Sequence, residues 1–261
     1  MRAGFNPGRR NRNIGTAKQG HGGDNRLVIP NISASGRTWG ETLGAHRRIQ
    51  RMVAGREVLL IVEQTRSGCE HACTLDDICR VLLHIPFADW AGLTTFVLRQ
   101  PTRKQRLLRP AWGRLFYHAN LGEIARPDMS DGPAVMLEAV DCGATIEWST
   151  ALQPDDMEEL DRLRRDGHTV DRIGRKYSIS VTAASVRATQ LYRTLLHEIG
   201  HWVDYLEKVE RPSWHADSDY PTPLDAYFQR PKDEREAFAH RYAERIGTQL
   251  RAAGVIPFDR Q

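Results

Sequence analysis

Two histidines four residues apart, with a glutamate directly after the first, form the pattern in this sequence that can do chemistry. They are His197, Glu198 and His201, inside the apolar run from Thr194 to Val203. Residues four apart in a helix lie on one face about one turn from each other, so both imidazoles can reach one metal ion. Glu198 flanks that position and can accept a proton from a metal-bound water. The spacing therefore predicts a catalytic zinc site; the alternative is an amphipathic helix with two surface histidines.

The residues around the motif repeat with helical periodicity. A buried stripe at three- and four-residue steps is predicted for Leu191, Leu195, Ile199, Trp202, Val203 and Leu206. Both histidines fall on another, polar side, which also holds Asp204. Asp204 is expected either to orient an imidazole by accepting its hydrogen bond or to be an ordinary helix-surface aspartate. Gly200 costs the helix about 1 kcal/mol relative to alanine, which indicates close approach by another chain segment or by substrate.

A catalytic zinc ion usually has three protein ligands and one position for water. Glu207 is excluded as the third ligand, because a continuing helix rotates it about 240° away from His201. A second helix is predicted after Pro231, since proline fits the first turn and the following acids favour its N-terminal end. We predict Glu236 of this helix as the third ligand, with Glu234 as the alternative.

Two alanines and a histidine that follow Glu236 also support a role for this helix in the site. Ala239 and Ala243 are small enough to let the second helix approach the first. His240, on the next turn from Glu236, is expected either to bind the metal or to line the site.

The two motifs together resemble the zincin metallopeptidases. His197-Glu198-Ile199-Gly200-His201, followed by Glu236-Ala237-Phe238-Ala239, is most similar to the gluzincin type and especially to the small intracellular ImmA/IrrE-like domains. The resemblance covers about residues 185–250. It implies an α+β fold in which a mixed β-sheet packs on the long motif helix, a second helix that supplies the third ligand, and a zinc-dependent peptidase.

The expected function is hydrolysis of a protein or peptide substrate with one zinc ion per chain. His197, His201 and Glu236 would hold the ion, and Glu198 would be the general base. The oxyanion formed in such a reaction needs a donor beside the metal. The candidates lie between the two helices and are His215, Tyr220 and Tyr227.

Length and composition indicate a globular protein without a membrane span. The 261 residues contain no apolar run near the roughly 20 residues that a bilayer requires, and no apolar segment follows the first arginines. We expect a cytoplasmic protein with a disordered basic tail over residues 1–40 and one domain over residues 41–261. That domain is expected to have a strand-rich half, residues 41–150, and a helical metal-binding half, residues 151–261.

The positive charge is concentrated near the start of the chain. Residues 1–26 hold six Lys or Arg and one Asp, a net charge of +5, so the remainder carries −1 of the total of +4. A solvated leader explains this tail, and contact with nucleic acid through it is the weaker alternative. A second basic run, residues 99–109, is expected to be a solvated connection between elements, with binding of a polyanion or a substrate carboxylate as the alternative.

The four cysteines are Cys69, Cys73, Cys79 and Cys142. Their spacing matches no compact zinc ribbon, so free thiols are expected rather than disulfides or a second zinc site.

Local patterns also predict the other elements. Helices are expected over residues 42–54, 74–83, 154–166 and 171–176, and strands over residues 57–63, 93–98, 111–118, 134–140 and 144–148. The last two strands are expected to pair around the turn at residues 141–143, and residues 212–223 to form an irregular loop.

The alternative function is a zinc-binding protein without catalytic activity. In that interpretation the metal stabilises the fold of a regulatory or interaction module. Glu198 disfavours it, because a structural site has no need of a base at that position.

Overall fold

The structure is a computed structural model that describes residues 43–261, except 109, 122–130 and 214–220. These residues belong to one compact unit of mixed α and β structure. The predicted α+β class is therefore confirmed. The predicted basic tail lies outside the described residues, as do His215 and Tyr220.

The larger sheet has five strands in the order β1-β2-β3-β5-β4. Their bounds are β1 His46–Val53, β2 Arg56–Glu63, β3 Thr95–Arg99, β4 Gly113–Asn120 and β5 Asp131–Glu138. The pairs β2–β3 and β3–β5 are parallel, whereas β1–β2 and β4–β5 are antiparallel. The sheet is therefore mixed, and β4 is one of its edge strands.

The central strands are apolar because both faces of the sheet are covered. In β2, Val58 and Leu60 belong to the main core, whereas Leu59 and Ile61 belong to a second cluster on the other face. Helix α3, Leu75–Leu83, contributes to the main core and begins at a capping box of Thr74 and Asp77. Short helices α4, Phe87–Trp90, and α5, Arg103–Leu108, flank β3 in the sequence.

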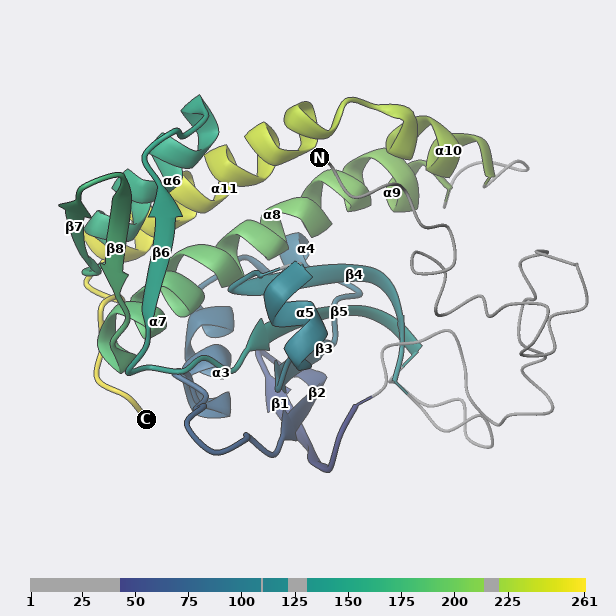
Figure 1. The fold of residues 1–261 in the computed structure, drawn as a ribbon. Helices are drawn as coiled ribbons and strands as arrows, with labels where there is room; N and C mark the ends of the chain where they lie inside the picture. Colours follow the sequence, from purple (N-terminus) through teal and green to yellow (C-terminus); the bar gives the residue numbers. More distant parts are fainter. Residues whose placement is uncertain (1–42, 109, 122–130, 214–220) are drawn as a thin grey trace, which may run out of the picture. The chain divides into compact units, whose positions relative to one another are not determined.

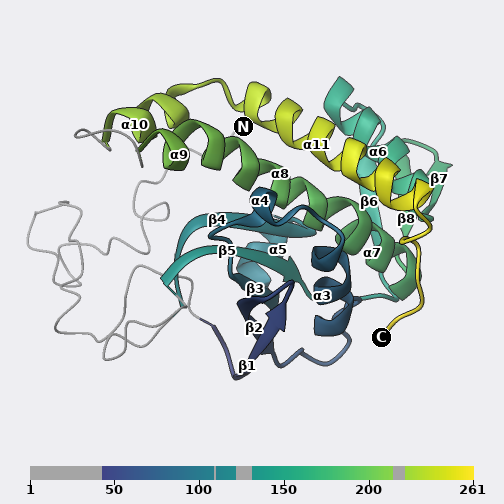
Figure 2. The ribbon, with the colours of Figure 1, turned by 180° about the vertical axis from the view of Figure 1, so that it is seen from behind.

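A second, three-stranded antiparallel sheet has the order β6-β8-β7. Its bounds are β6 Thr145–Ser149, β7 Thr169–Ile173 and β8 Lys176–Ser180. Helix α6, Pro154–Arg165, packs on it through Leu160 and Leu163, which share a small core with Ile179 of β8. Figures 1 and 2 show this sheet and α6 at one end of the compact unit of described residues.

The predicted motif helix is one part of a longer helical segment. It comprises α7 Ala183–Thr189, η2 Gln190–Thr194, α8 Leu195–Tyr205, η3 Leu206–Glu210 and α9 Arg211–Ser213. The segments η2 and η3 have π-helical turns, which are rare and often accompany functional sites. Helix α10, Pro221–Gln229, leads into α11, Lys232–Ala252, which lies beside α8 in both ribbon views (Figures 1 and 2).

Four local predictions are wrong. Residues 42–54 contain β1 instead of a helix, because a tight turn at Ala54 and Gly55, both with positive φ, folds β1 back onto β2. Residues 171–176 belong to the β7–β8 hairpin, which turns at Gly174. Strands β5 and β6 do not pair around residues 141–143 but belong to different sheets. The basic run contains α5 and the end of β3, where Arg99 is buried.

Other local predictions are confirmed. The helices that begin at Thr74, Pro154 and Pro231 have the expected starts, and the strand predicted over residues 57–63 is β2. Part of residues 212–223 is not described, and α9 and α10 occupy its two ends.

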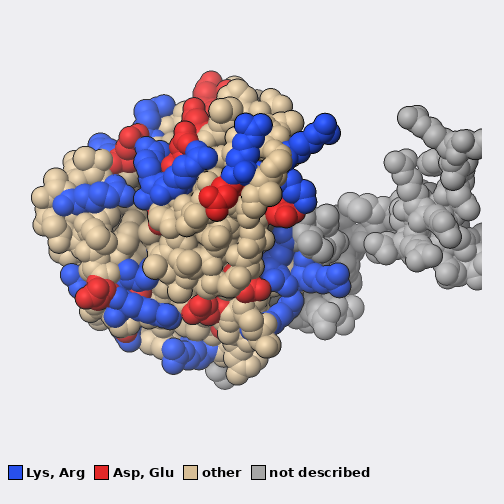
Figure 3. Space-filling view, turned by 60° about the vertical axis from the view of Figure 1, so that its left-hand side comes forward, with Lys and Arg blue, Asp and Glu red and all other residues tan. Residues whose placement is uncertain are grey.

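Within the described residues, every helix is too short or too polar to span a bilayer. On the face drawn in Figure 3, Lys and Arg side chains are interspersed with Asp and Glu. Ion pairs at the surface include Arg162 with Glu159 and Arg164 with Asp161 on α6. The four cysteines are present as free thiols, of which Cys73 is buried in the main core.

Candidate metal centre

The centre forms where α8 crosses α11. The predicted apolar stripe is buried in the main core, namely Leu191, Leu195, Ile199, Trp202, Val203 and Leu206, and Leu196 of α8 is buried there as well. The same helix rotation places His197 and His201 on the side next to α11. Only about 14% of the His197 side chain and 13% of the His201 side chain are exposed, so both rings are largely covered by neighbouring residues.

The two helices approach closely because small residues face each other. A Cβ atom on Gly200 would lie 3.0 Å from both Cα and the carbonyl oxygen of Ala239, and 3.1 Å from Cβ of Tyr242. Real Cβ atoms rarely come so near to backbone atoms. Gly200 and Ala239 therefore bring the α11 backbone close enough for Glu236, one turn before Ala239, to reach the histidines.

Three potential ligand atoms converge at this crossing. Nε2 of His197 and Nε2 of His201 are 3.1 Å apart, and Oε2 of Glu236 lies 3.4 Å from the first and 3.5 Å from the second. Three tetrahedral ligands at 2.0–2.1 Å from a zinc ion are separated by about 3.3 Å. The observed separations fit that geometry, and the set of two imidazoles and one carboxylate is a common donor set for catalytic zinc.

The electrostatics of the three residues agree with a shared site. Contacts with His197 and His201 hold the pKa of Glu236 well below its usual range, despite partial burial. Nδ1 of His197 is buried and has no hydrogen-bond partner in the described part of the chain. His197 is therefore positioned by packing rather than by a hydrogen bond to Nδ1.

Packing against His240 is one such contact. The rings of His197 and His240 have centroids 4.4 Å apart and are tilted by 44°. Burial, followed by the nearby His197 and Arg162, lowers the pKa of His240 to about 4. His240 therefore lines the centre as a neutral ring and lies outside the converging set.

Glu234 points elsewhere. Its carboxylate lies 3.5 Å from the Arg230 guanidinium and is largely exposed. Of the two candidates for the third ligand, the structure brings only Glu236 to the histidines.

Glu198 lies on the side of α8 that faces the sheet. Its side chain is buried, and Oε2 accepts a hydrogen bond of 2.8 Å from the backbone N–H of Leu115 in edge strand β4. Burial raises the pKa of Glu198, although the nearby His197 and His201 act in the opposite direction. A carboxylate with a raised pKa is better suited to exchange a proton near neutral pH than an ordinary surface glutamate.

Gly113 allows strand β4 to pack closely against the η2–α8 segment. A Cβ atom at this position would lie 2.8 Å from the Met136 carbonyl oxygen and 2.9 Å from Cγ2 of Thr194. The absence of a side chain lets β4 pack directly on the η2–α8 segment, which places the Leu115 N–H at Glu198. The sequence analysis missed this backbone donor, because a backbone N–H has no characteristic residue type.

Asp204 has different partners from those expected. Its buried carboxylate accepts a hydrogen bond of 2.9 Å from Arg230 and another from Lys208, and it also interacts with the Tyr227 hydroxyl. These partners tie α8 to η3 and α10. The prediction that Asp204 orients an imidazole is replaced by this structural role.

Tyr227 is also buried rather than open to the centre. Only 1% of the residue is exposed, and its hydroxyl lies 3.1 Å from the Tyr117 hydroxyl. Burial and the contacts with Tyr117 and Asp204 raise its pKa. This burial makes Tyr227 unsuitable as a direct donor to substrate. Tyr117, which the sequence analysis did not single out, is less buried and lies within electrostatic range of Glu198.

Comparison of the chain with family profiles, curated proteins and solved structures gives no match. The chemistry of the centre therefore has to be inferred from its own residues.

Proposed function

We propose that the protein is a zinc-dependent peptidase of the zincin type. The observation that supports this best is the convergence of His197, His201 and Glu236 within the distances expected of three zinc ligands, beside the buried carboxylate of Glu198. A mixed sheet lying on the motif helix and a second helix carrying the third ligand agree with the zincin resemblance of the sequence.

In this proposal each residue has one task. His197, His201 and Glu236 hold the ion, which when bound acts as a Lewis acid and lowers the pKa of water towards about 7. Glu198 accepts the proton that the attacking water loses. The Leu115 N–H fixes one carboxylate oxygen of Glu198, and the other has no hydrogen-bond partner among the described residues, so it can take that proton.

Metal analysis followed by a digestion assay tests the proposal. The full chain should purify with about one zinc ion, and it should cleave casein or members of a broad peptide library in a reaction that a chelator stops. Cleavage that persists after the metal is removed would contradict the proposal. Full zinc occupancy without cleavage, including in the presence of cell lysate as a source of activators, would favour the alternative of a zinc-braced module.

A further inference from the structure

Arg235 lies immediately before Glu236, in the first turn of α11. Its guanidinium carbon is 5.6 Å from the centroid of the Tyr227 ring and 5.5 Å from that of Phe228. Guanidinium groups bind the faces of aromatic rings at such distances. The two rings of α10 therefore hold the Arg235 side chain in a defined place, half-buried at the start of α11.

Arg235 has no counter-ion in the described part of the chain. No described carboxylate lies within 4 Å of its guanidinium, and its buried Nε has no hydrogen-bond partner there. The neighbouring acids have other contacts: Glu234 and Asp204 interact with Arg230, and Glu236 faces the histidines. Among the described residues, no anion offsets the cost of removing this half-buried guanidinium charge from water.

Tyr117 lies near both Arg235 and the candidate base Glu198. The Tyr117 hydroxyl contacts that of Tyr227, and its pKa, raised mainly by burial, is also influenced by the charges of both Arg235 and Glu198. Arg235, through the Tyr227 ring, and Glu198 therefore both lie near Tyr117 of β4.

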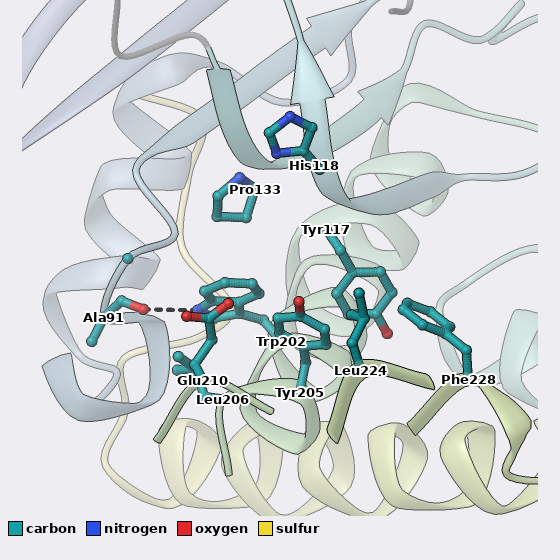
Figure 4. A pocket seen from close by; sticks show the side chains of 11 residues that line it. Ala91, Tyr117, His118, Pro133, Trp202, Tyr205, Leu206, Glu210, Leu224 and Phe228 are labelled. Atoms are coloured by element: carbon teal, nitrogen blue, oxygen red, sulfur yellow. Dashed lines mark hydrogen bonds between the residues drawn. The ribbon is translucent and has the colours of Figure 1, made fainter. Parts of the chain in front are cut away.

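The region around Tyr117 adjoins a cavity. Tyr117 and Phe228 line a space of about 670 Å³ between β4, the α8–η3 segment and α10 (Figure 4). Trp202 and Tyr205, which follow His201 on α8, also line it, and Phe228 is 44% exposed. Cavities of this size accept small ligands or a few residues of a peptide.

We propose that Arg235 binds a carboxylate of the substrate next to the metal centre. A guanidinium presents parallel N–H donors that match the two oxygens of a carboxylate, and the Tyr227 and Phe228 rings fix its orientation in advance. The carboxylate is either the C-terminus of a peptide or an acidic side chain. This inference rests on the proposed peptidase function and assigns a substrate preference to the same site.

Metal-binding thiols can test the inference without a known substrate. The full chain is loaded with Co²⁺, and binding is followed through the visible absorption of the ion. The probes are N-(3-mercaptopropanoyl)glycine and its carboxamide, which share the thiol and differ only in the terminal group. The acid should bind wild type at least about 10-fold more tightly than the amide, because a charge-assisted bidentate contact is stronger than a neutral one.

Substitutions identify the residue responsible. Arg235→Gln should remove the preference for the acid and leave amide binding and cobalt content unchanged, whereas Arg235→Lys should retain part of it. Arg245→Gln is the matched control, because Arg245 is also on α11 and lies 5.1 Å from the centroid of a tyrosine ring, that of Tyr242. This control should keep the full preference.

A further pair of thiols distinguishes the two sources of the carboxylate. One carries only a terminal carboxylate, and the other carries an acidic side chain with its terminus blocked as an amide. The probe whose tight binding depends on Arg235 identifies the source.

Two outcomes would overturn the inference without affecting the proposed metal centre. They are equal binding of the acid and the amide to wild type, and an unchanged preference for the acid in both Arg235 variants. Equal weakening of acid and amide by Arg235→Gln would also overturn it. Failure of Co²⁺ to bind would overturn the proposed function and this inference together.

Discussion

Gly200 of α8 lies against Ala239 of α11, so closely that a methyl group on Gly200 would be 3.0 Å from two backbone atoms of Ala239. The contact joins the helix that carries both histidines to the helix that carries Glu236. The geometry of the candidate centre therefore depends on a residue that has no polar side chain.

Replacing Gly200 with alanine tests this dependence. In an ordinary helix interior the change stabilises by about 0.5–1 kcal/mol. Here the added methyl group meets backbone atoms, so we expect the free energy of unfolding to fall by about 1–3 kcal/mol, as in other overpacked cores. Zinc affinity should fall as well, because α11 must move away from α8. Chemical denaturation and zinc titration measure the two effects.

Gly247→Ala is the control for this prediction. Gly247 lies in the partner helix α11, but its added Cβ would meet the far end of Arg251 at 3.2 Å and a methyl group of Leu196 at 3.6 Å. These atoms can adjust, so stability and zinc affinity should change little. Equal effects of the two substitutions would contradict the role assigned to Gly200.

The three converging side chains should be required for metal binding. We expect His197→Ala, His201→Ala and Glu236→Ala each to weaken zinc binding by more than about 100-fold, beyond the range seen for residues that only support a ligand. Glu234→Ala should bind zinc like wild type, because Glu234 contacts Arg230 instead. Titration against a chelator of known affinity measures these values. Full occupancy in a His197→Ala/His201→Ala double variant would show that the ion binds elsewhere.

The substitution Glu198→Gln distinguishes a catalytic zinc site from a zinc ion that only stabilises the fold. A glutamine oxygen can still accept the hydrogen bond from Leu115, so zinc content and thermal stability should remain close to wild type. Turnover should fall by about 10² or more, because the amide cannot accept a proton. The rates are compared on any peptide that wild type cleaves. Cleavage at the wild-type rate by this variant would exclude Glu198 as the base.

Asp77 should make stability sensitive to acid. Burial of its carboxylate alone would raise its pKa. The carboxylate also accepts hydrogen bonds from the Arg187 guanidinium and from the backbone N–H groups of Thr74 and Gln261. These hydrogen bonds outweigh burial and lower the pKa of Asp77 below its usual value. A carboxyl group whose folded pKa is depressed stabilises the fold above its unfolded pKa of about 3.9, and this stability is lost as pH falls through the folded value. The free energy of unfolding should therefore decrease below about pH 4.

Substitution identifies the contribution of Asp77 to this decrease. Asp77→Asn should lower stability at pH 7 by about 3 kcal/mol, since it leaves Arg187 without its charged partner, and it should flatten the decline in acid. Asp76→Asn is the matched control, because Asp76 is half exposed and pairs with Arg51 at the surface. Denaturation curves at pH 7, 4 and 3 compare the three proteins. Parallel declines in wild type and Asp77→Asn would show that another group is responsible.

Local chemistry explains which elements could be predicted from the sequence. The helices that begin at Thr74, Pro154 and Pro231 carry their start signals within a few residues, and the apolar stripe of α8 repeats with the helical period. The four-residue spacing of His197 and His201 places both imidazoles on one face of any helix. The position of Glu236 beside the buried stripe of α11 likewise follows from the helical period.

Other features were decided only by tertiary structure. β1 and β7 are strands because β2 and β8 pair with them; the local pattern predicted β2 as a strand but neither its pairing with residues 46–53 nor β8. The convergence of Glu236 with the histidines depends on the close contact of Gly200 with Ala239, and the placement of Glu198 depends on a backbone N–H of β4. Asp204 is expected from the sequence either to orient an imidazole or to lie on the helix surface, yet its carboxylate is buried and two cations and a hydroxyl reach it from other elements. Residue type and period determine which face of a helix a side chain occupies, whereas packing between distant segments determines what that face meets.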